Sequence, residues 1–191
     1  MSQHSTTAPP ARTVTDRLVL TAAGPADADD LYALNSDPRV WTHFPQGRHT
    51  DPEQTARQVA DFAADWARDG LGYWAARRRD DGALVGVGGV KLRREGVLNL
   101  YYRIAAEQQG QGFATELGRA AVDAAAGVLP GVPVTAFLLE HNAASRATAE
   151  KLGLRLVWRG PDAGNADPDA VRLVFADREL DDETLARVGG A

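Results

Sequence analysis

Residues 109–114 read Gln-Gly-Gln-Gly-Phe-Ala. This glycine-rich turn follows an alternating run typical of a strand and opens an alanine-rich stretch typical of a helix. The first N–H groups of a helix have no partner within it, and its N-terminus carries about half a positive charge. Gly110 and Gly112 lack the Cβ atoms that would obstruct a close approach. The stretch therefore predicts a main-chain site for a diphosphate-bearing ligand.

The residues around the two glycines narrow the class of ligand. A nucleoside-triphosphate loop requires Lys and then Ser or Thr after its last glycine, but Phe113 and Ala114 stand there. A dinucleotide fingerprint requires a third glycine, but Thr115 stands at that position. The loop therefore disfavours an NTPase and a nucleotide-binding oxidoreductase. A purely structural role stays open, because glycine also ends strands.

Further motifs follow at a defined distance from this loop. Residues 140–145 read Glu-His-Asn-Ala-Ala-Ser, and residues 149–154 read Ala-Glu-Lys-Leu-Gly-Leu. Together with Gln109-x-x-Gly112-x-Ala114, these blocks resemble the GNAT superfamily of N-acetyltransferases. They are similar to its acetyl-CoA pyrophosphate loop, the end of its fifth strand, and the helix that follows that strand.

The beginning of the chain resembles one branch of the same family. Residues 17–20, Arg-Leu-Val-Leu, and residues 37–41, Asp-Pro-Arg-Val-Trp, are similar to the ribosomal-protein N-terminal (Rim-type) acetyltransferases. The resemblance covers roughly residues 15–180. We therefore expect one acetyltransferase domain between a disordered N-terminal tail at 1–14 and a C-terminal tail at 181–191.

The resemblance implies an α/β (α+β) fold with a mixed, mostly antiparallel central sheet of about seven strands. Helices flank this sheet, and strands four and five are parallel and splayed. The periodicity of hydrophobic residues along the chain agrees with this fold. A capping box at Thr50-Asp-Pro-Glu53 marks a helix start, and Asp80-Asp81-Gly82 is a hairpin signal. The expected helices cover about 27–36, 51–69, 113–128 and 143–152, and the expected strands about 17–21, 73–78, 84–92, 97–104, 134–139, 154–158 and 171–176.

The implied function is an acetyl-CoA-dependent N-acetyltransferase that moves the acetyl group directly to a primary amine in a ternary complex. A catalytically idle acetyl-CoA-binding or scaffold domain is the alternative, because two residues that many relatives use in catalysis are replaced. Arg146 and Lys151 can reach the 3′-phosphate of the coenzyme, or can pair with Glu150. The residues expected to bind the coenzyme are Ile104, Gln109, Gly110, Gln111, Gly112, Phe113, Ala114, Thr115, Asn142, Arg146 and Lys151.

The first replacement concerns the base that takes a proton from the amine. Alignment of Tyr102-x-Ile104 with the fourth strand of the family puts Asn99 where many relatives have a glutamate. An amide cannot accept the proton, so Asn99 favours an acceptor of low pKa, such as an α-amine near about 8, or a base from elsewhere. Glu140 and His141 are the nearest other candidates, unless they form a solvated loop pair.

The second replacement concerns the group that stabilises the departing thiolate. Many relatives have a tyrosine seven residues after the asparagine, where this chain has Ala149. Ser145 is what the Rim-type branch offers instead, and it shares a helix face with Ala149 and Leu152. The serine either hydrogen-bonds the coenzyme sulfur or bonds its own backbone. Asn142 either contacts the coenzyme or caps the helix, or does both.

Aromatic and histidine side chains are candidates for the wall of an acceptor cleft. Aromatic residues at strand and helix ends can equally belong to the core. The acceptor class stays open among protein N-termini, free amino acids, polyamines and aminoglycosides. The candidates are Trp41, His43, Phe44, Trp74, Tyr101 and His141.

The composition agrees with one soluble domain. The chain has 191 residues, 44% of them hydrophobic, and no run approaches the ~20 apolar residues of a membrane span. Residues 1–15 lack the apolar centre of a secretory signal, so a cytoplasmic location without a membrane partner is expected. With no cysteine and four scattered histidines, no metal is expected. The net charge of −5 disfavours nucleic acid, so we expect a monomer or homodimer that acts on a small-molecule or peptide amine.

Overall fold

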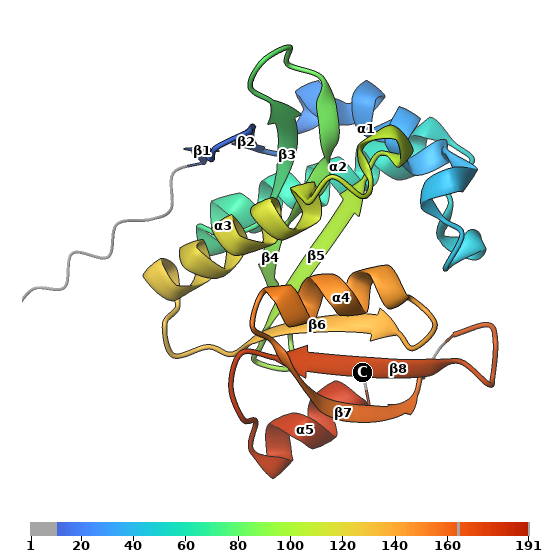
Figure 1. Cartoon of the computed structure of the whole chain (residues 1–191), viewed down its shortest axis with the longest axis vertical. Coiled ribbons are helices and arrows are strands. Elements are labelled where there is room, and N and C mark those ends of the chain that lie inside the picture. The colour runs from blue at the N-terminus through green and yellow to red at the C-terminus, as the bar shows by residue number, and fades with distance from the viewer. Residues whose placement is uncertain (1–10, 164, 191) are drawn as a thin grey trace, which may run out of the picture.

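The computed structural model describes residues 11–163 and 165–190. Within these ranges one sheet of eight strands runs in the order β1-β2-β3-β4-β5-β6-β8-β7, and helices lie on both of its faces (Figure 1). The strands are β1 (Arg12–Val14), β2 (Leu18–Ala22), β3 (Tyr73–Arg78), β4 (Leu84–Leu92), β5 (Leu98–Ile104), β6 (Val134–Leu139), β7 (Arg155–Pro161) and β8 (Val171–Ala176). The α-helices are α1 (Ala28–Ser36), α2 (Pro52–Asp69), α3 (Phe113–Val128), α4 (Ala143–Lys151) and α5 (Asp182–Gly189), and the 3-10 helices are η1 (Pro25–Asp27), η2 (Pro38–Val40), η3 (Pro45–Gly47) and η4 (Ala106–Gln108).

The sheet has the mixed, mostly antiparallel character expected from the sequence. β5 and β6 are parallel, and the other neighbouring strands are antiparallel. The long periodic elements lie within a few residues of their expected positions. In the described part of the chain, no helix has the length and apolar character that a membrane crossing requires.

Both ends of the described chain contain structure where tails were expected. Arg12–Val14 form β1, which is antiparallel to β2 and too short to show an alternating pattern. Asp182–Gly189 form α5, which begins at the cap Asp181 and buries Val188 against the sheet. Secondary structure therefore extends into both ranges where tails were expected, while residues 1–10 and 191 lie outside the described part.

Helix α2 begins one residue later than its sequence signal suggested. The expected capping box put Thr50 at the N-cap, but the N-cap is Asp51, whose Oδ1 accepts a hydrogen bond from the Glu53 N–H at 3.0 Å. Aspartate is as good a cap as threonine, and Pro52 suits the first helical position. The helix ends at Gly70, whose φ of 65° is readily accessible only to glycine.

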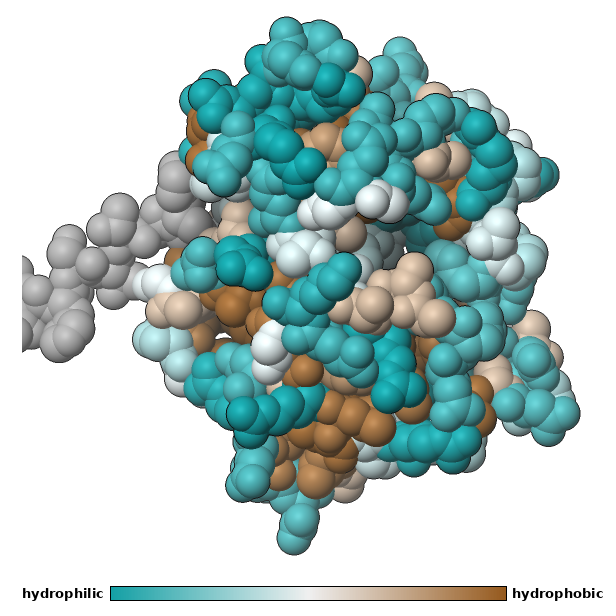
Figure 2. All heavy atoms as spheres, in the orientation of Figure 1, coloured by the Kyte–Doolittle hydropathy of each residue, from teal (hydrophilic) through white to brown (hydrophobic). Residues whose placement is uncertain are grey.

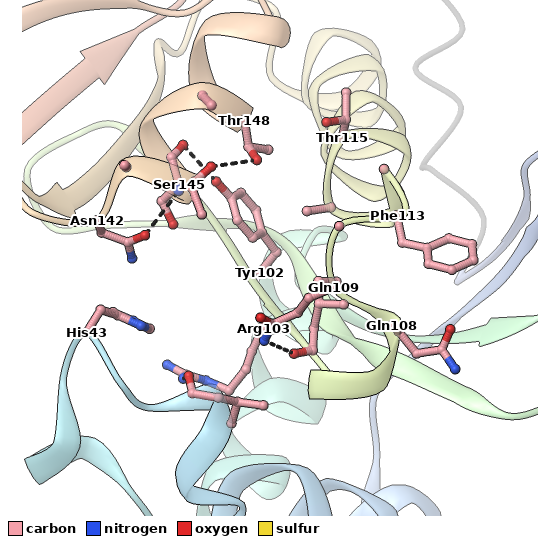
Figure 3. Close-up of a pocket in the computed structure, with 18 of the residues that line it drawn as sticks. His43, Tyr102, Arg103, Gln108, Gln109, Phe113, Thr115, Asn142, Ser145 and Thr148 are labelled. Atoms are coloured by element: carbon pink, nitrogen blue, oxygen red, sulfur yellow. Dashed lines mark hydrogen bonds between the residues drawn. The ribbon is translucent and has the colours of Figure 1, made fainter.

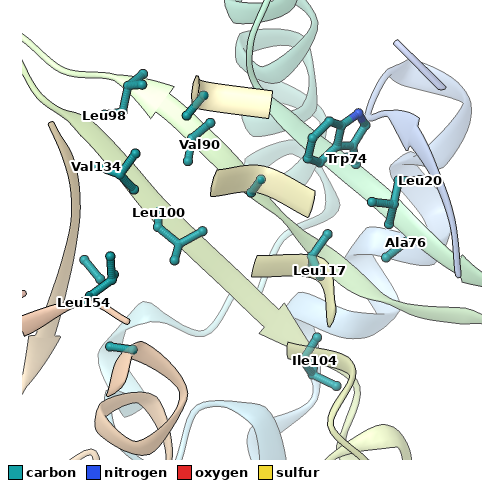
Figure 4. Close-up of a cluster of buried hydrophobic side chains, with 14 of the residues drawn as sticks. Leu20, Trp74, Ala76, Val90, Leu98, Leu100, Ile104, Leu117, Val134 and Leu154 are labelled. Carbon is teal, nitrogen blue, oxygen red and sulfur yellow. The ribbon is translucent and has the colours of Figure 1, made fainter. Parts of the chain in front are cut away.

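Two hydrophobic clusters fill the two faces of the sheet. On one face, Leu117 of α3 lies in one cluster with strand residues such as Leu100 and Val134 (Figure 4). On the other face, α1 and α2 bury Leu31 and Phe62 against β3 and β4. Burial of a leucine or phenylalanine side chain contributes about 1.5–3 kcal/mol, so these clusters hold the sheet that carries the site.

Strand β4 is unusually rich in glycine because its neighbours approach it closely. A Cβ atom added at Gly86 would overlap the backbone carbonyl oxygen of Arg103 on β5. We expect Gly86→Ala to lower the free energy of unfolding by at least about 1–3 kcal/mol, because the overlapping atom belongs to the backbone and cannot rotate away. Urea denaturation checks this, with Gly127→Ala as the control, since a Cβ there meets nothing within 4 Å. Equal midpoints for the two variants would contradict the prediction.

The parallel pair β5 and β6 stays together at only one end. Its register consists of Leu98 opposite Val134 and Asn99 opposite Thr135. Beyond these positions the two strands diverge, as expected for splayed strands (Figure 1). Tyr102 and Ile104 therefore lie at the open end of the pair.

Candidate active site

A cavity of about 660 Å³ lies at the open end between β5 and β6. Its walls are the end of β5 with residues 104–115, the first turns of α4, and the segment 39–43 between α1 and α2 (Figure 3). The space-filling view has a hollow between the upper part of the molecule and α4 (Figure 2). Segments distant in the sequence thus form one site.

The glycine loop, residues 109–112, forms one wall of this cavity. Gly110 and Gly112 have φ angles of 75° and 82°, which explains why both positions are glycine. Helix α3 begins directly after Gly112, and its first internal bond runs from Glu116 N–H to the Gly112 carbonyl at 3.1 Å. The N–H groups of residues 113–115 therefore have no carbonyl ahead of them within the helix. The loop has the main-chain geometry that an anionic group requires.

Arg17 braces the back of the glycine loop. Its Nη1 donates to the Gln111 carbonyl at 2.9 Å, its Nε donates to Glu116 Oε2 at 2.7 Å, and its guanidinium lies 4.3 Å from the Phe113 ring centroid. Although burial alone would raise it, hydrogen bonds from Thr15 and Arg17 hold the pKa of Glu116 below its usual value. Glu116 is therefore an anion that fixes Arg17 against the loop.

The side chains of the glycine loop have different positions. Gln109 lines the cavity and donates from Nε2 to the Ile104 carbonyl at 3.1 Å, which holds the loop against the end of β5. The side chain of Gln111 instead donates to the Glu107 carbonyl at 2.9 Å and does not line the cavity. The other expected coenzyme residues on this side that line the cavity are Ile104, Gly110, Gly112, Phe113, Ala114 and Thr115.

Two hydroxyl-bearing residues of α4 and one of β5 line the opposite wall. Asn142 is the N-cap, and its Oδ1 accepts from the Ser145 N–H at 3.1 Å, while the residue also lines the cavity, so its coenzyme contact stays a prediction. Tyr102 points from β5 toward this turn and donates to the Ser145 carbonyl at 3.1 Å (Figure 3). Burial raises the pKa of Tyr102, so its phenol keeps its proton at neutral pH. Ser145, Thr148 and Tyr102 line the same cavity.

Tyr102 was missed as a site residue in the sequence. Alternation along β5 places it on the face of Leu98, Leu100 and Ile104, toward α3 and α4. Ala149 of α4, where many relatives have a tyrosine, is fully buried. The phenol from β5 thus stands near the position from which the helix tyrosine is absent. The alternation along β5 predicts the face of the sheet on which Tyr102 lies, but only the structure shows that its side chain reaches α4.

Two of the expected catalytic residues, Asn99 and Glu140, do not line the cavity. Asn99 does not line the cavity, and its Oδ1 is buried without a hydrogen-bond partner among the described residues. Glu140 also lies outside the cavity lining, in an ion pair with Arg159 at 2.6 Å. The hydrogen bond from Arg159 lowers the pKa of Glu140, so this carboxylate is a weak base.

The candidate acceptor wall contains the two histidines. His43 and His141 line the cavity, and His141 donates from Nε2 to the His43 carbonyl at 2.9 Å across it. Burial, together with the positive charges of Arg103 and His141, lowers the pKa of His43. Its ring is therefore neutral at pH 7.

The aromatic candidates belong to the core rather than to this wall. Trp41 is 6% exposed and donates from Nε1 to the Asn35 carbonyl at 2.6 Å. Tyr101 stacks on Tyr73 at 5.1 Å between centroids, within the cluster under α1 and α2. Trp74 is 1% exposed on the other face of the sheet. None of these side chains lines the cavity, and Phe44 does not line it either.

The two cations expected near the 3′-phosphate behave differently. Arg146 pairs with Glu150 at 3.0 Å on the exposed side of α4 and does not line the cavity. Lys151 lines it, and also lines a second cavity of about 1010 Å³ between α3 and the β1–β2 turn. Lys151 is therefore the better placed of the two for a phosphate.

Arg39 and Arg103 complete the acceptor side, and the sequence singled out neither. Arg39 pairs with Asp37 and with Glu107, so it joins the acceptor wall to η4. Arg103 is 9% exposed and reaches the same wall from β5. Both depend on partners that are distant along the chain, which a local pattern does not reveal. No group of three or more metal-ligating side chains gathers in the described residues.

A family model, described as an acetyltransferase (GNAT) domain, matches residues 17–155 of the chain. The chain belongs to the GNAT acetyltransferase family. It is therefore an acyltransferase that uses acetyl-CoA, as the resemblance implied. The curated protein YkkB of Bacillus subtilis, which is described as uncharacterized, is 28% identical over 145 residues, or 74% of this chain and 83% of YkkB.

Solved structures of GNAT acetyltransferases have the same fold. A GNAT-family acetyltransferase from Bordetella pertussis superposes with a TM-score of 0.74 at 22% identity, over 87% of this chain and 99% of that one. The ribosomal L7/L12 alpha-N-protein acetyltransferase RimL, solved in complex with coenzyme A, gives 0.72 at 21% identity, over 88% and 97%. Rim-type enzymes are thus among the structural neighbours of this GNAT protein.

Proposed function

We propose that this protein transfers the acetyl group of acetyl-CoA directly to a primary amine, with both substrates bound at once. The observation that carries the proposal is that one cavity contains both the glycine loop and the wall of His43 and His141. An amine that enters along the histidine wall would meet a thioester held by the loop in the same space. Proximity of this kind converts a bimolecular reaction into one within the complex.

The coenzyme would lie along the wall formed by α3, β5 and α4. Its pyrophosphate would accept hydrogen bonds from the N–H groups of residues 113–115, where the helix N-terminus favours negative charge. Its 3′-phosphate would lie near Lys151, which faces both cavities. The pantetheine arm would pass through the gap between β5 and β6, so the sulfur would approach Ser145 and Tyr102.

The hydroxyl group of Ser145 is suited to stabilise the departing thiolate, whereas the Tyr102 phenol already donates its proton to the Ser145 carbonyl. The Ser145 N–H donates to the Asn142 cap, and Ser145 lines the cavity. Preorganised donors aimed at developing charge are a large source of catalysis, because they need no rearrangement in the transition state. Ser145 would be the direct donor, and the Tyr102 phenol would hold the turn that carries it.

Proton removal from the acceptor is assigned to the titration of the amine itself. No carboxylate lines the cavity within the described residues, and the lowered pKa of His43 makes it a weak acceptor of a proton from an amine. The neutral fraction of the amine, and with it kcat/KM, should therefore rise with pH up to the pKa of the amine.

We expect the pH profile of kcat/KM to follow the acceptor. Two acceptors of similar shape should give profiles displaced by the difference between their amine pKa values. Glu140→Gln, His141→Ala and His43→Gln should leave the position of each profile unchanged. A profile that stays fixed across acceptors, and that loses its limb in His43→Gln, would instead identify His43 as a protein base.

A thiol-release assay with acetyl-CoA tests the proposed function as a whole. An amine panel that includes peptides, amino acids, polyamines and aminoglycosides should contain an acceptor that releases coenzyme A stoichiometrically with acetylated product. A parallel titration measures coenzyme affinity. Tight coenzyme binding with no turnover of any amine would overturn the proposal and support an idle coenzyme-binding domain.

A further inference from the structure

Arg103 places a buried positive charge at the acceptor end of the cavity. Its guanidinium lies 3.3 Å from the centroid of the Trp41 ring, and the residue is 9% exposed. The residue also lines the cavity beside Val40 and His43. A buried charge is costly unless it is paired, so its partners decide what it is for.

The contacts of Arg103 are all neutral. Its Nε donates to the Tyr101 hydroxyl at 2.8 Å, and its Nη1 donates to the Val40 carbonyl at 3.0 Å. No ion pair of Arg103 occurs within residues 11–163 and 165–190. A guanidinium carries five N–H donors in a planar fork that matches a carboxylate. The two protein contacts leave most of this capacity unused.

The other charges near the cavity do not neutralise Arg103. The lining contains cations and histidines but no aspartate or glutamate among the described residues. The acids closest in sequence to the wall, Asp37 and Glu107, are paired with Arg39, and Glu140 is paired with Arg159. The charge of Arg103 acts on the cavity. Burial is the main cause of the lowered pKa of His43, and the charge of Arg103 is the next.

We propose that Arg103 binds a carboxylate of the acceptor, so that the acceptor is an amine that also carries an acidic group. This inference rests on the proposed function and names the acceptor class within it. A free amino acid and an acidic peptide share this chemistry. Polyamines and aminoglycosides do not, because each would bring further positive charge to a site that already holds one. Arg103 is thus a specificity-determining residue, and it would also orient the amine toward the thioester.

The carboxylate preference can be tested by the binding of N-acetylated ligands to the coenzyme-loaded protein, because these ligands have no amine that titrates. Isothermal titration would compare N-acetylalanine with N-acetylalaninamide, in which a neutral amide replaces the charged carboxylate. N-acetyl-Ala-Asp amide and N-acetyl-Ala-Asn amide form the peptide pair. We expect each acid of the favoured source to bind about 10- to 100-fold more tightly than its amide, the range for hydrogen bonds to a charged group.

Variants at position 103 connect the preference to the residue. Arg103→Met should remove the difference between acid and amide, and Arg103→Lys should keep only part of it, because a point charge lacks the bidentate fork. Arg57→Gln removes an exposed charge on α2 that pairs with Glu53, and it should behave as the native protein. Coenzyme affinity and thermal unfolding of each variant establish that the fold and the coenzyme site are intact.

The outcomes separate this inference from the proposed function. Equal binding of acids and amides in the native protein, or a preference that persists in Arg103→Met, overturns the inference. If Arg103→Met does not fold, the inference is tested by the affinity difference between acid and amide in the native protein and by the decrease of that difference in Arg103→Lys. Acids that bind through Arg103 while no amine is acetylated would uphold the anion site and refute the transferase. Turnover of amines, including polycations, without any preference for acids would uphold the transferase and refute the anion site at Arg103.

Discussion

Gly112→Val is expected to weaken acetyl-CoA binding by about 100-fold or more, because two or more hydrogen bonds to charged phosphates would be lost. Gly112 has φ 82°, which a β-branched residue tolerates poorly. Relief of this strain would turn the N–H groups at the start of α3 away from the pyrophosphate. A titration of coenzyme against the folded variant measures the effect.

Gly96→Val is the matched control for this strain. Gly96 has a similar φ of 77° in the turn before β5, and it does not line the cavity. Both variants should lose stability by about 1–3 kcal/mol from the unfavourable backbone conformation. Only Gly112→Val should lose coenzyme affinity in its folded fraction. Unchanged affinity in folded Gly112→Val would refute a coenzyme role for the glycine loop.

Ser145→Ala is expected to lower kcat by about 10- to 1000-fold with little change in coenzyme affinity, the order seen when one stabilising donor is lost. Its N–H would still bind the Asn142 cap, so α4 should begin as before. Steady-state kinetics at saturating acetyl-CoA and thermal unfolding of the same variant separate catalysis from stability. Normal turnover per folded molecule would remove Ser145 from the mechanism.

Tyr102→Phe tests how the serine is positioned. It removes the hydroxyl that donates to the Ser145 carbonyl but keeps the ring in the cluster under α3. We expect a smaller decrease in kcat than for Ser145→Ala, and no further decrease when both changes are combined, because residues that act as a unit are not additive. Multiplicative effects would show that the two hydroxyls act independently.

The parts of the fold that were predictable are those determined by local sequence. Helix α2 and strands β3 to β5 carry long periodic patterns with clear turn signals, so their positions followed from the sequence. The backbone conformation of the glycine loop was also predictable, because glycine readily adopts the positive φ angles found at Gly110 and Gly112. By contrast, β8 lies between β6 and β7, and no local pattern gives that order.

The acceptor side was harder to predict because its residues act through distant partners. An aromatic residue such as Trp74 suits a cleft wall as well as a core. Because β3 is covered on both faces, the residue type does not show on which face of the sheet Trp74 lies. Arg103 is an ordinary arginine in the sequence. Its importance comes from Trp41 and Val40, which lie 62 and 63 positions away. The structure had to bring these segments together before the charge could be recognised.

The bracing of the glycine loop by Arg17 links the coenzyme site to the folding of the whole domain. The bonds from Arg17 to Gln111 and to Glu116 span 94 and 99 positions of the chain. The loop therefore cannot acquire its binding geometry as an autonomous unit, since closing so long a span requires β2 to be docked. A ligand that binds only this docked state shifts the unfolding equilibrium of the entire domain. A coenzyme bound at the loop should accordingly slow amide exchange in β2 as well as in the loop itself.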